Sequence, residues 1–64
     1  MRELTTYTER DTWLATRERI GYICDPGTVT LDIWAIELYQ KHDGGYSILI
    51  TTDSDESWLV CDFE

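Results

Sequence analysis

The segment His42-Asp43-Gly44-Gly45, followed directly by YSILITT over residues 46–52, decides how the middle of this sequence folds. Asp-Gly is typical of tight hairpin turns, because glycine readily adopts the positive φ that such turns require. The run after the turn is rich in β-branched and aromatic residues, which favours a strand. A hairpin needs a strand on its other side as well. We therefore interpret residues 28–40 as a strand, although the spacing of their apolar residues alone would also suit a helix.

Working outward from this hairpin, a second polar turn leads into another strand-like run over residues 58–63. Upstream, Thr8 suits a helix cap, and apolar side chains recur at helical spacing as far as Gly21, which suits a helix end. We therefore expect a helix over residues 8–20. The expected fold class is α+β, with one N-terminal helix packed on a three-stranded antiparallel sheet in the order α-β-β-β. A chain of this length is expected to form a single acidic domain over residues 1–64.

Alternation along the three expected strands divides their side chains between two faces of the sheet. We expect the helix, through Trp13, Leu14 and Ile20, to cover the face with Trp34, Ile36, Leu38, Ile48, Ile50, Leu59, Cys61 and Phe63. The opposite face carries Ile33, Ala35, Tyr39, Leu49, Trp58 and Val60 beside Glu37 and Asp62, which is more apolar than a solvated face requires. This second face is expected either to dock onto a partner or a second copy, or to be covered by the arm around Leu4 and Tyr7 or by Tyr22-Ile23.

Acidic residues strongly outnumber basic ones, with thirteen Asp and Glu against five Lys and Arg and a formal net charge of -8. This charge argues against nucleic acid or an anionic membrane as a direct partner and favours a basic protein. The excess is concentrated after residue 32, where seven acids accompany Lys41 alone, whereas residues 1–32 hold six acids and four arginines. We therefore expect the binding surface in the second half. Adaptation to a high-salt habitat would produce a similar composition and is an alternative.

The candidate partner-binding residues are mostly acidic: Glu37, Asp43, Asp53, Asp55, Glu56, Asp62 and Glu64, with Trp58 as an apolar anchor. On a strand, residues i and i+2 share a face about 6.6 Å apart. Asp62 and Glu64 therefore form an evenly spaced pair of carboxylates, and Asp53 and Asp55 do so if strand geometry continues into the turn. Such rows imitate a phosphate backbone, so a basic DNA-binding protein is the expected partner.

The reactive residues argue against enzymatic chemistry. His42 is the only histidine, and it lies in the expected hairpin turn with neither cysteine near it in sequence. No closely spaced Cys or His pair suggests a metal site, and no glycine-rich loop suggests a phosphate site. Residues 53–64 match part of a calcium-loop pattern, but Trp58 stands where such a loop needs glycine. We therefore expect neither an enzyme nor a bound cofactor.

Two cysteines, Cys24 and Cys61, are too few for a disulfide framework, and the sequence begins without the apolar run of a signal peptide. No apolar stretch reaches the length of a transmembrane helix. We expect both thiols to be reduced in a cytoplasmic protein that does not enter membranes.

In small size, acidic composition and lack of catalytic residues, the chain resembles the phage-encoded anti-CRISPR proteins, in particular those that mimic DNA. The residues that carry the resemblance are the carboxylates of Asp53-Ser54-Asp55-Glu56 and Asp62-Phe63-Glu64. The resemblance implies a non-catalytic inhibitor that occludes a basic nucleic-acid-binding surface, on a subunit of a type I CRISPR-Cas surveillance complex. Other phage DNA mimics share these features. The alternative is an acidic protein-interaction or dimeric accessory module that docks through the apolar sheet face.

Overall fold

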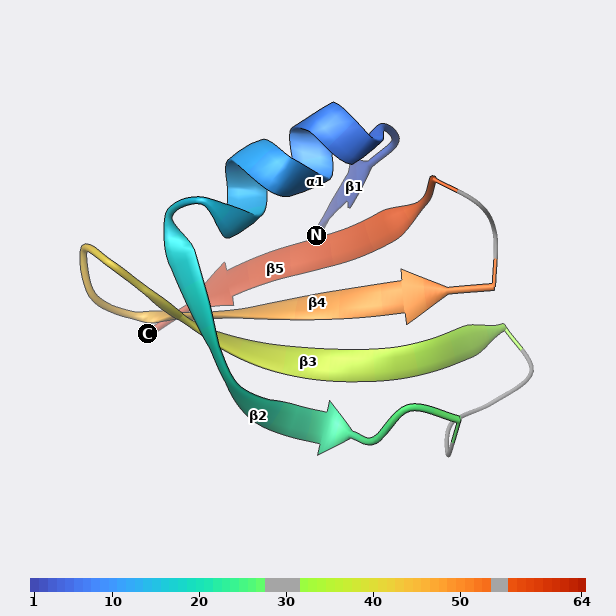
Figure 1. Ribbon diagram of the computed structural model, residues 1–64. Helices are drawn as coiled ribbons and strands as arrows, with labels where there is room; N and C mark the ends of the chain where they lie inside the picture. The colour runs from blue at the N-terminus through green and yellow to red at the C-terminus, as the bar shows by residue number, and fades with distance from the viewer. Residues whose placement is uncertain (28–31, 54–55) are drawn as a thin grey trace.

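In the computed structural model, which describes residues 1–27, 32–53 and 56–64, five strands form a single sheet with one helix packed on it (Figure 1). The elements in chain order are β1 (Arg2–Leu4), α1 (Tyr7–Leu14), β2 (Arg17–Cys24), β3 (Ile33–Lys41), β4 (Tyr46–Thr52) and β5 (Trp58–Phe63). All neighbouring strands are antiparallel, and their order across the sheet is β1-β5-β4-β3-β2. The last strand of the sequence therefore lies inside the sheet, between β1 and β4.

The expected α-β-β-β fold with a three-stranded sheet is wrong, because the sheet has five strands and the helix is short. The helix predicted over residues 8–20 ends at Leu14, and the chain turns into β2 at Arg17. The reason lies in Ile20-Gly21-Tyr22-Ile23, where β-branched and aromatic side chains surround a glycine, a combination that disfavours a helix. Pairing with β3 supplies the backbone hydrogen bonds of this segment instead.

The hairpin predicted at Asp43-Gly44-Gly45 is confirmed. β3 and β4 pair in register from Gln40 opposite Tyr46 onward, and Gly44 and Gly45 adopt φ values of 100° and 79°. The bounds of β4 and β5 match the predicted strands over residues 46–52 and 58–63. Of the strand predicted over residues 28–40, β3 includes the part from Ile33, and residues 28–31 lie outside the described ranges.

The helix is capped two residues earlier than predicted, by Thr6 rather than Thr8. The Thr6 hydroxyl accepts a hydrogen bond from the Glu9 backbone N–H at 3.1 Å, and the Glu9 carboxylate accepts from the Thr5 hydroxyl at 3.0 Å. These reciprocal bonds satisfy donors at the helix start. The hydrogen bond from the Thr5 side chain is the main reason that the pKa of Glu9 is lowered.

None of the helices within the described ranges has the length and apolar character needed to cross a bilayer.

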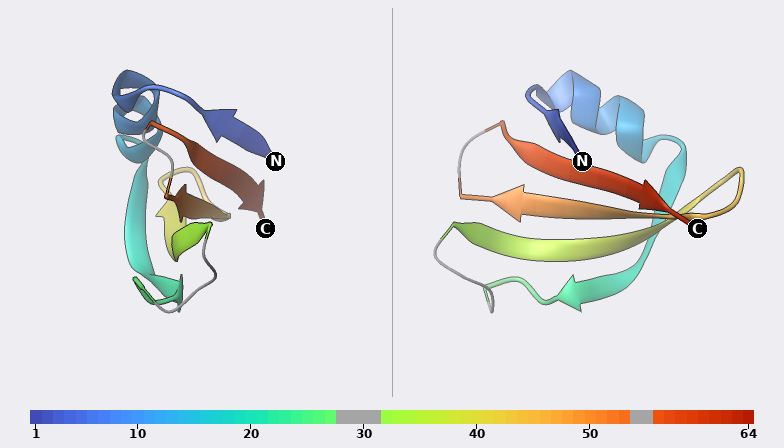
Figure 2. Two further views of the ribbon diagram at one scale, coloured as in Figure 1. Left: turned by 90° about the vertical axis from the view of Figure 1, so that its right-hand side faces the viewer. Right: turned by 180° about the vertical axis from the view of Figure 1, so that it is seen from behind.

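The helix packs on one face of the sheet, and none of the segments that the structure describes covers the other face (Figure 2). Trp13 meets Tyr39 edge-on, with ring centroids 5.1 Å apart, and Tyr7 meets Trp58 at the same distance. The buried apolar residues in the described ranges are Leu4, Trp13, Ala35, Tyr39, Leu49, Trp58 and Val60. This arrangement reverses the predicted faces. The face predicted to be open forms the core, and the face predicted to form the core is the uncovered one.

The reversal has a physical cause in β1. Leu4 pairs with Trp58 in the β1–β5 ladder, so both side chains point to the same face, and the chain then enters α1 above that face. Tyr7 therefore packs over Trp58, as expected if the N-terminal arm covers this surface, whereas Leu4 lies within the sheet in β1 and adds its side chain to the core on this face.

Candidate functional site

Asp62, one of the predicted partner-binding residues, is held within the protein by three neighbours. Both oxygens of its carboxylate accept hydrogen bonds from Arg17 Nη2 at 3.2 Å. The hydroxyl of the fully buried Ser47 donates a hydrogen bond to Asp62 Oδ1 at 2.5 Å. Nζ of Lys41 lies 3.7 Å from Asp62 Oδ2. The Ser47 hydrogen bond, aided by Arg17 and Lys41, lowers the pKa of Asp62. Asp62 thus ties β5 to β2, β3 and β4, and its charge is compensated.

Glu37 and Trp58 also contact other residues of the protein, on the face of the sheet that α1 covers (the helix-covered face). The Tyr39 hydroxyl donates to Glu37 Oε2 at 2.6 Å, and Nη1 of Arg19 lies 3.7 Å from the same oxygen. Burial, reinforced by the hydrogen bond to Glu37, raises the pKa of the Tyr39 hydroxyl. Only 13% of the Glu37 side chain is exposed, and Trp58 is buried under the ring of Tyr7. Neither residue presents a surface to a partner.

The remaining predicted site residues separate into two groups at opposite ends of the sheet. Asp43 lies in the β3–β4 hairpin, with its carboxylate 3.9 Å from Lys41 Nζ, and it lines a shallow hollow together with Asp62 and Glu64. Asp53 and Glu56 are exposed in the turn between β4 and β5, at the other end. Asp55 lies outside the described residues. The predicted acidic site is therefore not one surface.

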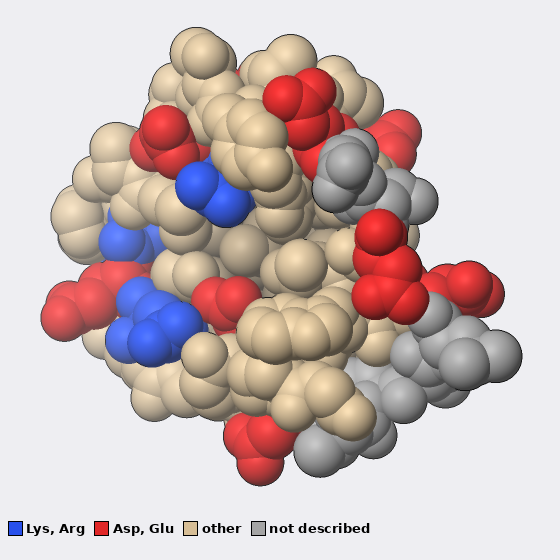
Figure 3. All heavy atoms as spheres, turned by 45° about the vertical axis from the view of Figure 1, so that its right-hand side comes forward, with Lys and Arg blue, Asp and Glu red and all other residues tan. Residues whose placement is uncertain are grey.

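A different group of acids gathers where the β2–β3 and β4–β5 connections meet. The backbone N–H of Asp53 donates to the Asp32 carbonyl at 3.3 Å, which holds the two connections together. Glu3 reaches the same end, because its carboxylate accepts from the Ser57 hydroxyl at 2.6 Å. We call Glu3, Asp32, Asp53 and Glu56 the acidic end. None of these four forms an ion pair with a described lysine or arginine. In Figure 3, the Lys and Arg atoms in view (blue) lie on the left, away from the Asp and Glu atoms on the right (red).

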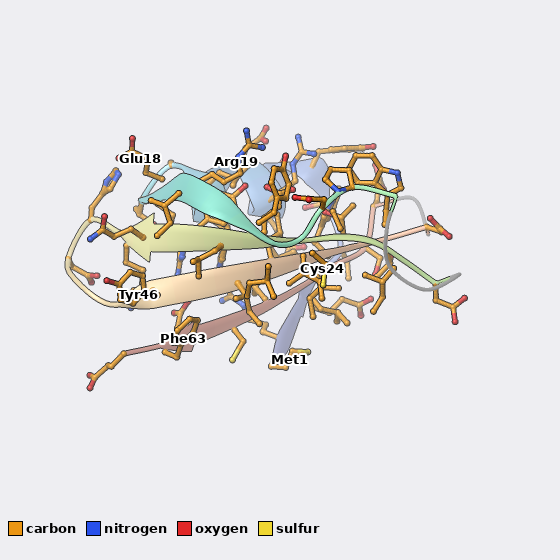
Figure 4. All side chains as sticks on the ribbon, turned by 90° about the horizontal axis from the view of Figure 1, so that it is seen from below. Met1, Glu18, Arg19, Cys24, Tyr46 and Phe63 are labelled. Carbon is orange, nitrogen blue, oxygen red and sulfur yellow. The ribbon has the colours of Figure 1, made fainter. Side chains whose placement is uncertain are left out.

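The largest feature without a covering layer is the sheet face away from α1, which is built from three rows of paired residues. Leu59, Ile50, Ile36 and Cys24 form one row; Cys61, Ile48 and Leu38 form the next; Phe63 and Tyr46 form the third. We call these nine residues the open face. Viewed edge-on, α1 lies on one side of the sheet, and Met1 and Phe63 lie on the other (Figure 4).

The side chains of the open face are partly to largely exposed. Phe63 and Tyr46 stack with ring centroids 5.9 Å apart and retain 44% and 39% exposure, while the isoleucines and leucines of the central strands are half-buried by their neighbours. The charged residues paired into these rows, Glu3 and Glu18, belong to the two edge strands. The centre of the face is therefore apolar and uncharged.

The sequence pattern placed seven of these nine side chains, all except Cys24 and Tyr46, in the predicted core. The informative signal was Ile48-Leu49-Ile50, which is apolar in both phases of the strand alternation. Such a run is typical of a strand buried on both faces. The helix supplies one of the two covers.

The described residues offer little for catalysis or metal binding. No group of three or more His, Cys, Asp or Glu side chains within residues 1–27, 32–53 and 56–64 is arranged to hold a metal ion. His42 is exposed in the hairpin, and Cys24 and Cys61 are both free.

Comparison with protein-family models, curated proteins and solved structures gave no match for this chain.

Proposed function

We propose that this protein is a non-catalytic binding protein that docks onto a protein partner through the open face. The observation that carries the proposal is the two-sided apolar character of β3, β4 and β5, of which α1 covers one side only. Burying apolar surface is worth roughly 25 cal/mol per Å². Contiguous exposed apolar surface on a small protein marks an interaction site.

The polar residues of the helix-covered face support a binding role rather than a catalytic one. Asp62, Glu37 and Tyr39 are engaged in ion pairs and hydrogen bonds that connect the strands, which is a structural use of these groups.

We propose a cytoplasmic location for the protein, because the two free cysteines contribute to the open face and suit a reducing compartment.

A photo-crosslinking experiment tests this function. Phe63 is replaced by benzoylphenylalanine, which resembles the native side chain and sits on an exposed part of the open face. The matched control carries the same amino acid at Thr12, which is exposed on α1. We expect covalent protein adducts in the cell from position 63 and not from position 12. Equal labelling from both positions, or no adduct from position 63, would contradict the proposal.

A second function, mimicry of DNA, is favoured by the acidic end. Glu3, Asp32, Asp53 and Glu56 lie together, whereas Arg17, Arg19 and Lys41 are paired with other carboxylates. An uncompensated group of carboxylates attracts the lysines and arginines of a DNA-binding protein. With the resemblance to anti-CRISPR proteins, this supports an inhibitor that occludes a basic DNA-binding surface, on a CRISPR-Cas effector subunit of type I.

A DNA-competition assay with a type I surveillance complex tests the mimicry. Replacing Asp53 and Glu56 by serine is expected to weaken inhibition, and the loss should be greatest at low salt. The control replaces Asp43 and Glu64 by serine, which removes the same charge from the hairpin end. Equal effects of the two double variants would show that overall charge matters rather than the acidic end. If the native chain unfolds at low salt, its acidity reflects adaptation to a saline habitat.

A further inference from the structure

We propose that the partner on the open face is a second copy of this chain, packed face to face with the first as a two-sheet sandwich. This inference rests on the proposed function and names the occupant of the same surface. It depends on the size of the face, the absence of charge at its centre, the shape of the sheet edges and the position of the acidic end.

The dimensions of the open face suit a sheet better than a helix. The molecule measures 33 × 23 × 16 Å between Cα atoms, and the two longer dimensions run in the plane of the sheet (Figures 1 and 2). Their product, about 760 Å², is an upper limit on the area of the face, and it is of the same order as the roughly 800 Å² that each partner buries in a standard protein interface. A single partner helix, about 10 Å in diameter, would cover less than half of the shorter dimension. A second sheet of the same size covers the whole face.

The composition of the open face is compatible with two-fold symmetry. In a symmetric dimer each residue near the axis meets its own copy, so a charge there would repel itself. The central strand of the sheet is β4, whose contributions to the open face are Tyr46, Ile48 and Ile50. Whichever way the axis runs in the plane of the sheet, these three apolar side chains meet one another or their own copies. Two copies also share the same twist, so their sheets can pack about 10 Å apart in the aligned manner of a β-sandwich.

The edges of the sheet are poorly suited to binding a further strand, which leaves the face as the docking surface. β1 has three residues, so one edge is short. β2 forms the other edge, and its pairing with β3 shifts register between Arg19 and Gly21 and again between Tyr22 and Cys24. Bulges and charged residues on an edge strand oppose strand addition.

The acidic end determines how the two copies are oriented. If the two-fold axis ran along the strands, the acidic ends of both copies would lie together. An axis across the strands places each acidic end beside the hairpin end of the other copy, where Arg17 and Lys41 offset nearby acids. Facing strands therefore run in opposite directions. Because each chain carries a net charge of -8, added salt should strengthen the dimer by screening repulsion.

Sedimentation equilibrium of the purified chain tests the inference. We expect a reversible monomer–dimer equilibrium whose dissociation constant falls as NaCl rises from about 50 to about 500 mM. Ile48→Asp buries two new charges in each dimer and should raise the dissociation constant by about 100-fold or more. Phe63→Ser, at a side chain that is 44% exposed, should raise it by about 10-fold.

The matched control is Thr12→Asp, which adds the same charge at an exposed position of α1, on the other side of the sheet. It should change the dissociation constant by less than about twofold, since surface substitutions away from an interface have little effect. Circular dichroism establishes that each variant is folded, and if Ile48→Asp is not, Phe63→Ser decides the comparison. A native chain that remains monomeric to about 1 mM, or a dimer that Thr12→Asp dissociates as strongly as the open-face variants, would overturn the inference.

The crosslinking result separates this inference from the proposed function. Adducts from position 63 at twice the mass of the chain support both. A monomeric chain whose position 63 captures a different protein overturns the second copy and leaves the docking function standing. A monomeric chain without specific adducts overturns both.

Discussion

Replacing Ser47 by alanine should destabilise the protein far more than the loss of one small hydroxyl suggests. The Ser47 side chain is fully buried on β4, where it accepts a hydrogen bond from Arg17 Nε at 2.9 Å and donates one to Asp62. Arg17 is itself 11% exposed, so the variant leaves its Nε in a site with little access to water. From β4, the Ser47 hydroxyl therefore supports the ion pair between Arg17 of β2 and Asp62 of β5.

The size of the effect follows from these contacts. A hydrogen bond to a charged group contributes about 1.5–3 kcal/mol, and Ser47 makes two, while the direct contact between Arg17 and Asp62 survives the change. We expect a loss of about 2–3 kcal/mol. A chain of 64 residues has a free energy of unfolding of about 3–10 kcal/mol, so this is a large fraction. The melting temperature should fall by roughly 10–20 °C.

Urea unfolding followed by circular dichroism measures this loss, at one protein concentration because self-association would add to stability. Ser57→Ala is the matched control, since its hydroxyl donates to Glu3 at an exposed position. It should cost about 0.5 kcal/mol or less. If Ser47→Ala costs no more than Ser57→Ala, then the polar cluster does not hold the strands together, and Asp62 would again be a candidate for partner binding.

Two further predictions concern the helix-covered face. Because the pKa of Asp62 is lowered in the folded state, its ionised form stabilises the protein at pH values above roughly 4, and this stabilisation is lost as pH falls through the lowered pKa. At pH 6 the native protein should have a free energy of unfolding about 1 kcal/mol higher than that of Asp62→Asn, a small difference because Asp62 is partly exposed. This difference should vanish near pH 2, and a difference that persists in acid would contradict the prediction. Trp13→Ala should cost about 3–5 kcal/mol and leave much of the protein unfolded at 25 °C, whereas Trp34→Ala, at a side chain 48% exposed, should cost less than about 1 kcal/mol. Equal losses in the two tryptophan variants, measured by thermal unfolding, would show that α1 is not the main cover of the sheet.

The parts of the fold that depend on local sequence could be predicted, and those that depend on distant pairing could not. The Asp-Gly-Gly turn fixes the β3–β4 hairpin through backbone conformations that glycine adopts, and β5 follows a polar turn. β1 is three residues long, and nothing near Arg2 in sequence indicates that it pairs with Val60. The spacing of Trp13, Leu14 and the residues after them fits a helix, but β3 offers hydrogen bonds to residues 17–24 that outweigh this local preference.

The candidate site was mispredicted for the same reason. Asp62 and Glu37 looked uncompensated because Arg17 and Arg19, which pair with them, lie on β2 within the segment that was predicted to be helical, residues 8–20. The choice of covered face was open as well, since β4 is apolar on both sides and alternation alone does not tell which side receives α1. Knowing that Leu4 pairs with Trp58 would have resolved it.

The position of β5 between β1 and β4 also determines when the protein can fold during synthesis. β1 has no strand to pair with until the ribosome has released residues 58–63, so Leu4 and α1 leave the ribosome long before β1 can join the sheet. The meander from β2 to β4 can form earlier, through contacts that are close in sequence. The ladder between β1 and β5 joins segments far apart in sequence, and such contacts form slowly. A nascent chain interrupted before Trp58 would therefore lose two strands rather than one, and the side of β4 that α1 normally protects would lack its neighbours.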